Sequence, residues 1–240
     1  MLAIVFVATV IRSAFGFGEA LIAVPLLALC MPLAVATPLA VLLSISVAAV
    51  VVAQDWRHIH LGSAAGLVAA TLFGIPLGMM VLTNAHQQAV KAGLGILIML
   101  FASYSLVARG GPRLEREHKP LLLLAGFVAG ILGGAYGMNG PPLVVYGSLR
   151  RWSPQHFRAT LQAYFLPASM LGMVGYWSVG LWTRAVTREF LWSVPVMLPA
   201  VFVGRAINRR FSGPGFLKYV YGGLVLIGGM LFFEAVRHQR

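Results

Sequence analysis

The sequence has few charged residues and very few acidic ones. Of its 240 residues, 10% are charged and only 6 are Asp or Glu, whereas 59% are hydrophobic and the mean hydropathy is +0.86. A soluble domain carries roughly 25% charged residues, so this composition excludes an ordinary soluble protein. The single cysteine, Cys30, excludes an intrachain disulfide, and its place in an apolar run predicts a small packed side chain.

Recognisable catalytic and metal-binding motifs are also missing. The sequence has no HExxH motif and no pair of carboxylates within one apolar segment. His58 and His60 are closely spaced, but no third ligand is evident near them. We therefore expect no enzymatic activity, no cofactor and no bound metal. The 18 Lys and Arg residues are spread between apolar segments, which indicates topology and lipid contacts and argues against nucleic-acid binding.

What the sequence does have is a series of long apolar segments. Conventional membrane spans are predicted at Leu33–Val52, Leu61–Leu82, Ala89–Val107, Phe157–Val179, Phe190–Ala206 and Phe216–Val236. The N-terminus lacks a basic region and an obvious cleavage site, so we expect it to be retained and not to be a signal peptide. The predicted fold is all-α, a polytopic transmembrane helical bundle.

Two further apolar segments are longer and interrupted. Leu2–Leu29 contains AFGFGEALIAVPLLAL, and Pro120–Leu149 contains AYGMNGPPLVVYGSL. Setting Gly16 against Gly137 also aligns Gly18 with Asn139. Amides freed by such breaks are unsatisfied in lipid, so each break must face protein or a water-filled cavity. Two broken segments at matching places in two halves are typical of the central site of a transporter.

The two halves of the chain repeat one plan within a single domain, 1–240. Repeat 1 covers residues 1–108 and repeat 2 covers 120–240, with a charged connector at 109–119. Each repeat holds one broken segment and three spans. The last spans also match, because the spacing of Val90, Gly93 and Leu94 recurs at Val220, Gly223 and Leu224.

The distribution of basic residues favours one topology. If each broken segment is a re-entrant hairpin, the repeats are inverted, and basic residues gather on one face more strongly than if these segments cross fully. This prediction puts the connector in the cytoplasm and both termini outside.

Arg12 and Glu19 are charged residues within the first apolar segment, where a charge costs a few kcal/mol unless it is paired or hydrated. We interpret Arg12 as an anion contact and Glu19 as a proton-coupling candidate. The alternatives are a purely structural Arg12–Glu19 pair, an Arg12 that snorkels to lipid headgroups, and a Glu19 that only caps a helix.

The helix starts near Gly18 and Gly140 suit anion binding, since free amides and the helix dipole favour negative charge there. The predicted substrate-binding set is Arg12, Gly16, Gly18, Gly137, Asn139, Gly140 and Pro141. Alternatively, the glycines only permit close helix packing. A second polar set, Arg158, Thr160, Gln162 and Tyr164, forms either part of a polar pathway or an interfacial anchor.

These residues resemble the sulfite exporter TauE/SafE family, also called the 4-toluene sulfonate uptake permease family. The resemblance spans nearly the whole chain, and its most specific feature is a glycine-rich break followed by a proline-containing helix in each half. It implies a membrane carrier with two inverted repeats, and several members are linked to sulfite, sulfoacetate or other small sulfur-containing anions. Many members have glycine where this chain has Glu19 and Asn139.

The predicted function is therefore secondary transport of a small anion, of the sulfite, sulfoacetate or sulfonate class, by alternating access. The expected location is the cytoplasmic (inner) membrane, as a multi-pass protein. The expected partners are the lipid bilayer, the anion and protons as coupling ion, with no particular oligomeric state indicated. An anion channel and a membrane interaction or assembly protein without transport are the alternatives.

Overall fold

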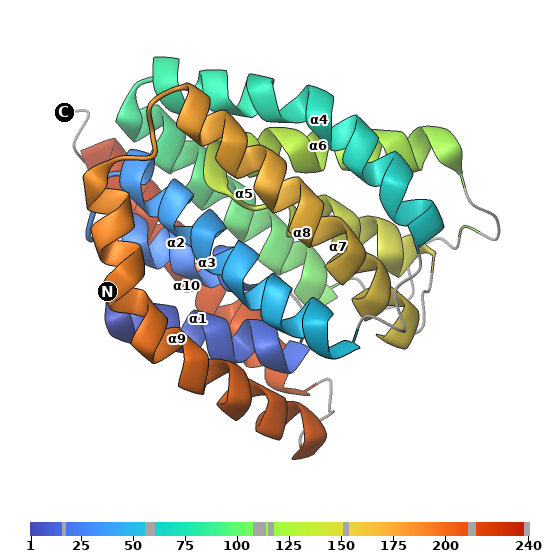
Figure 1. Cartoon of the computed structure of the whole chain (residues 1–240). Helices are drawn as coiled ribbons and strands as arrows, with labels where there is room; N and C mark the ends of the chain where they lie inside the picture. The colour runs from blue at the N-terminus through green and yellow to red at the C-terminus, as the bar shows by residue number, and fades with distance from the viewer. Residues whose placement is uncertain are drawn as a thin grey trace.

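The structure is a computed structural model that describes residues 1–15, 18–55, 61–107, 114, 118–150, 154–210 and 215–237. Within these ranges the chain forms ten α-helices and no strand (Figure 1). The helices are α1 (Leu2–Phe15), α2 (Glu19–Ala28), α3 (Leu33–Asp55), α4 (Leu61–Asn84), α5 (Gln87–Val107), α6 (Lys119–Tyr136), α7 (Gly140–Leu149), α8 (Pro154–Ser178), α9 (Arg184–Arg210) and α10 (Gly215–Arg237). The predicted all-α fold is confirmed.

The bundle has the surface of a membrane protein. In the described part of the chain, five helices are long and apolar enough to cross a membrane, through Leu33–Val50, Ala65–Asn84, Gln87–Val107, Lys119–Tyr136 and Arg184–Ile207. Large apolar side chains such as Phe73, Phe202 and Phe233 are mostly exposed on its outside. Contact with lipid tails stabilises such an apolar surface, whereas contact with water is unfavourable.

The first interruption lies between α1 and α2. Gly18 precedes α2 with a φ of 98°, in the left-handed region that favours glycine. A hydrogen bond shows that the chain turns back here: Thr9 Oγ1 donates to Glu19 Oε1 at 3.3 Å. In one straight helix the Cα atoms of these two residues would lie about 15 Å apart along the axis. Gly16, which was predicted to share this break, lies outside the described residues.

The second interruption lies between α6 and α7. Gly137 ends α6 with a φ of 65°, and its N–H donates to the Gly133 carbonyl at 2.8 Å, as in a left-handed C-cap. At the other end of the pair, the Leu114 N–H donates to the Leu149 carbonyl at 3.0 Å. If α6 and α7 were collinear, Leu149 would lie about 45 Å from Lys119, whereas the chain from Leu114 to Lys119 spans at most about 18 Å. The second broken segment is therefore a hairpin of α6 and α7, and its re-entrant placement in the membrane stays a prediction.

The helix pairs of the bundle follow a two-fold pattern: the main pairs between the halves have equivalent pairs when α1–α5 are matched in order with α6–α10. α1 packs on α9 as α6 packs on α4, while α3 pairs with α8 and α5 with α10. In Figure 1, α4 and α6 run together along one side of the bundle and α1 and α9 along the opposite side. This arrangement supports the predicted duplication, and the boundaries at 1–108, 109–119 and 120–240 stay a prediction.

Several glycines outside the two breaks serve close helix packing. A Cβ added at Gly78 or Gly130 would overlap backbone atoms of the facing helix, across the α4–α6 contact. Gly95 and Gly228 bring α5 and α10 together in the same way, since each Cβ would lie within 3 Å of the other residue's carbonyl oxygen. These four glycines lie within helices, away from the two breaks.

The prediction for Cys30 is wrong. Its side chain is exposed, because α2 ends at Ala28 and Cys30 falls in the turn that leads to α3. The apolar run that contains it is continuous in sequence, but the helix is not.

Candidate functional site

The starts of α2 and α7 meet at a small cavity within the bundle. Its described lining consists of Arg12, Gly18, Glu19, Ala20, Leu21, Ser44, Gly137, Met138, Asn139, Gly140, Pro141, Phe165 and Ser169. The cavity volume is about 20 Å³, which holds about one water molecule. Apart from Gly16, the residues that the sequence singled out in the two broken segments thus surround one cavity, although they come from opposite halves of the chain.

Arg12, on α1, presents a partly unsatisfied guanidinium to this cavity. The residue is 4% exposed, so it does not snorkel to the surface. Its Nη1 donates to Glu19 Oε2 at 3.1 Å and to Ser44 Oγ at 2.6 Å, and its guanidinium carbon lies 5.3 Å from the centre of the Phe165 ring. Its Nε and Nη2 are buried and have no hydrogen-bond partner among the described residues. Buried polar groups are nearly always paired, so these two donors are unusual.

Glu19, the first residue of α2, faces Arg12 as its counter-charge. Its carboxylate accepts hydrogen bonds from Arg12 and from Thr9. The N-cap residue of α2 is Gly18, and no side chain forms a capping hydrogen bond at this helix start. Glu19 is therefore not an ordinary capping residue. The predicted structural pair is therefore present, and it lines the cavity at the same time. The positive end of α2 adds to the stabilisation of the negative charge.

The two helix starts offer the cavity different numbers of amide donors. The first three N–H groups of a helix have no partner within it. In α2 these groups belong to Glu19, Ala20 and Leu21. In α7 two of the three positions are Pro141 and Pro142, which have no N–H, so Gly140 supplies the one free amide of that turn. The start of α2 therefore has more amide N–H groups without a partner in its own helix than the start of α7 has.

Asn139 is held in place from behind the cavity. Its side chain packs directly on Gly133, where an added Cβ would overlap the amide. It also interacts with the hydroxyl of Tyr164, which lies 2.7 Å from Thr71 Oγ1. Thr71 in turn donates to the Gly126 carbonyl at 2.8 Å. This buried chain joins α8, α4 and α6 to the start of α7.

Three of the lining residues lie outside the two broken segments and were not predicted from the sequence. Ser44 on α3, and Phe165 and Ser169 on α8, reach the cavity only because these helices cross at the centre of the bundle. Ser44 and Ser169 are serines within apolar spans, but Ser46 is another, so this signal does not single them out. Of the second polar set, Tyr164 and Thr160 are buried, while the side chains of Arg158 and Gln162 lie outside the described residues.

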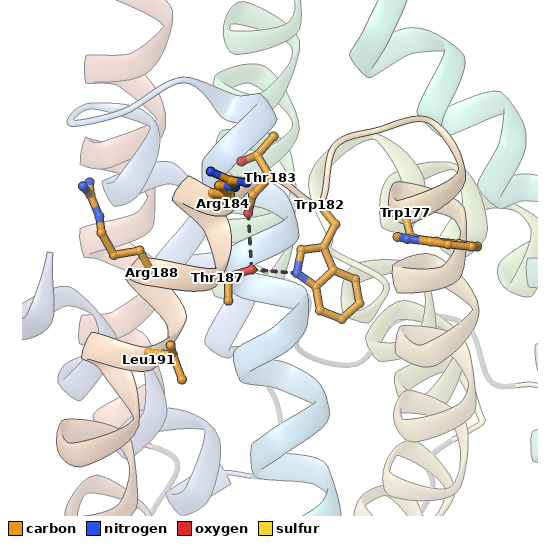
Figure 2. A pocket seen from close by; sticks show the side chains of 7 residues that line it. All are labelled: Trp177, Trp182, Thr183, Arg184, Thr187, Arg188 and Leu191. Atoms are coloured by element: carbon orange, nitrogen blue, oxygen red, sulfur yellow. Dashed lines mark hydrogen bonds between the residues drawn. The ribbon is translucent and has the colours of Figure 1, made fainter.

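A larger groove lies at the corner between α8 and α9 (Figure 2). It has a volume of about 570 Å³ and is lined by Trp177, Trp182, Thr183, Arg184, Thr187, Arg188 and Leu191. The Trp182 indole donates to Thr187 Oγ1 at 3.0 Å, as Figure 2 shows. The groove shares no described residue with the cavity, and the Arg188 side chain is 71% exposed. Exposed tryptophans and arginines at helix ends are typical of the membrane interface.

Comparison with known proteins establishes the family. Residues 1–232 match the family described as Sulfite exporter TauE/SafE. The chain belongs to this family. A relative from Cupriavidus necator, named probable sulfite/organosulfonate exporter TauE, is 25% identical over 182 residues, which cover 76% of this chain and 70% of the relative. No solved structure matches the chain. As a TauE/SafE protein it is a multi-pass membrane protein of a transporter family, as the motifs predicted.

Proposed function

We propose that this TauE/SafE protein is a secondary carrier of a small oxyanion, of the sulfite or organosulfonate class, in the cytoplasmic membrane. The observation that carries the proposal is the pair of unpartnered donors, Nε and Nη2 of Arg12, in a buried cavity between two helix starts. An oxyanion at this place would satisfy both donors and receive the helix dipoles. The name of the relative supports a sulfur-containing substrate.

Within this proposal, Arg12 is the main ligand and the residues around the two breaks complete the site. Gly18 and Gly137 allow the breaks, Asn139 and Gly140 supply donors, and Pro141 fixes the first turn of α7. Glu19 and the substrate would both bind the guanidinium of Arg12. Protonation of the Glu19 carboxylate would remove its negative charge, and the anion would then bind Arg12 more strongly. Such an exchange would couple anion movement to protons.

The size of the cavity favours a carrier over a channel. A volume of about 20 Å³ holds about one water, whereas sulfite has four heavy atoms. The site must therefore widen for an oxyanion to bind, and movement of one repeat against the other supplies such a change. The contacts that join the two halves include those of α1 with α9, α3 with α8, α4 with α6 and α5 with α10, and these would have to slide or tilt.

Counterflow in proteoliposomes tests the proposal. Labelled sulfite outside should accumulate when unlabelled sulfite or a sulfonate is trapped inside, and the rate should saturate with concentration. Non-saturating flux without counterflow would indicate a channel. Absence of exchange by folded protein, across a panel of sulfite, sulfonates and small carboxylates, would favour the hypothesis that the glycines serve packing alone.

A further inference from the structure

The guanidinium of Arg12 has one occupied nitrogen and one free edge. Both hydrogen bonds come from Nη1, to Glu19 and to Ser44, whereas Nε and Nη2 have no partner in the part of the chain that the structure describes. Nε and Nη2 lie on the same side of the planar group, where their N–H bonds run parallel. Two parallel donors fit two oxygen atoms of one oxyanion, and a single-atom halide cannot accept both in line.

The charges around the cavity cancel. Among the described lining residues, Arg12 and Glu19 carry a charge, and their side chains are 4% and 0% exposed. The cost of moving an ion out of water rises with the square of its charge. Because the side-chain charges sum to zero, only the partial positive charges of the two helix starts offset that cost, and a doubly charged ligand is at a disadvantage.

We infer that this cavity selects singly charged oxyanions with at least two oxygens, such as sulfonates, over doubly charged ones, and that Glu19 sets the preference. The inference rests on the proposed transport function and adds the charge and shape of the substrate. While its carboxylate is ionised, Glu19 acts on a ligand at the free edge of Arg12 as a nearby negative charge. Its repulsion is proportional to the charge of the ligand, so a dianion loses twice the free energy that a monoanion loses.

Methanesulfonate and sulfate are matched probes of this inference. Both are tetrahedral and similar in size, with charges of −1 and −2 at neutral pH, and chloride serves as a single-atom monoanion. Affinities can be measured by titration calorimetry on the full chain in detergent. We expect wild type to bind methanesulfonate about tenfold or more tightly than sulfate or chloride.

The decisive variant is Glu19→Gln, which keeps an oxygen for Arg12 Nη1 and removes the charge. If methanesulfonate then binds tenfold more tightly, sulfate should gain about a hundredfold, because the gain follows ligand charge. Ser44→Ala is the control, since it removes the other Nη1 partner without a change of charge and should leave the ratio of the two affinities unaltered. Glu19→Ala replaces Glu19→Gln if the latter does not fold.

The possible results separate the inference from the function on which it rests. Equal affinity of wild type for sulfate and methanesulfonate, or equal gains in Glu19→Gln, would overturn the charge preference. If Arg12→Ala still abolished binding of both anions in that case, the proposed anion site would stand. Unchanged binding in Arg12→Ala would overturn both.

Discussion

Gly137, at the break between α6 and α7, gives a prediction in which backbone strain and packing can be measured separately. Gly137 has a φ of 65° and Gly180 a φ of 75°, so alanine at either position must adopt the left-handed conformation. That conformation costs an L-residue about 1–2 kcal/mol. The two sites differ in their surroundings. A Cβ at Gly137 would lie 3.0 Å from Val41 Cγ2, whereas nothing lies within 4 Å of one at Gly180.

The Gly137→Ala variant should therefore lose more stability than Gly180→Ala. Overpacking adds about 1–3 kcal/mol to the backbone cost at Gly137. Thermal unfolding of purified protein in detergent measures the difference, at roughly 2–4 °C per kcal/mol for a chain of this size. Gly172→Ala is the second control, because Gly172 has neither close neighbours nor a positive φ, and this change should be neutral or slightly stabilising.

Equal losses in Gly137→Ala and Gly180→Ala would refute the close approach of α3 to the second break. That approach helps to place Gly137 at the cavity. A result of this kind would therefore also weaken the assignment of Gly137 to the site.

Two further predictions concern buried polar contacts. Tyr176→Phe should destabilise the protein by about 1–3 kcal/mol, because the Tyr176 hydroxyl donates to the Gly133 carbonyl at 2.5 Å near the end of α6. The control is Tyr104→Phe, at an exposed position, which should have little effect in the same unfolding assay. Arg12→Met should cost about 3–5 kcal/mol by leaving the Glu19 carboxylate buried without its counter-charge, and Glu19→Gln added to it should restore part of that loss. Additive effects of the last two changes would show that the pair is not coupled.

The parts of the site that could be predicted from sequence are residues that are unusual within a membrane-spanning segment. A charge within an apolar run, or a cluster of glycine and proline within a span, is costly wherever it lies, so Arg12, Glu19 and the two breaks could be recognised without a structure. The hairpin form of the second break was also predicted, because the distribution of basic residues depends on which face each loop occupies.

The parts that could not be predicted depend on how helices cross. Ser44, Phe165 and Ser169 lie in ordinary apolar spans, and only the meeting of α3 with α8 brings them to the cavity. The free edge of Arg12 is likewise a property of three-dimensional placement, since sequence cannot show which nitrogen Glu19 and Ser44 occupy. Cys30 was placed wrongly because continuous hydrophobicity hides the end of a helix.

Anion exchange by Arg12→Ala is the measurement that tests the central claim most directly. The matched control is Arg188→Ala, which removes an exposed arginine from the groove between α8 and α9. In proteoliposomes with equal amounts of folded protein, Arg12→Ala should lose sulfite and sulfonate counterflow, while Arg188→Ala should keep the wild-type rate. Counterflow at the wild-type rate in Arg12→Ala would contradict the account.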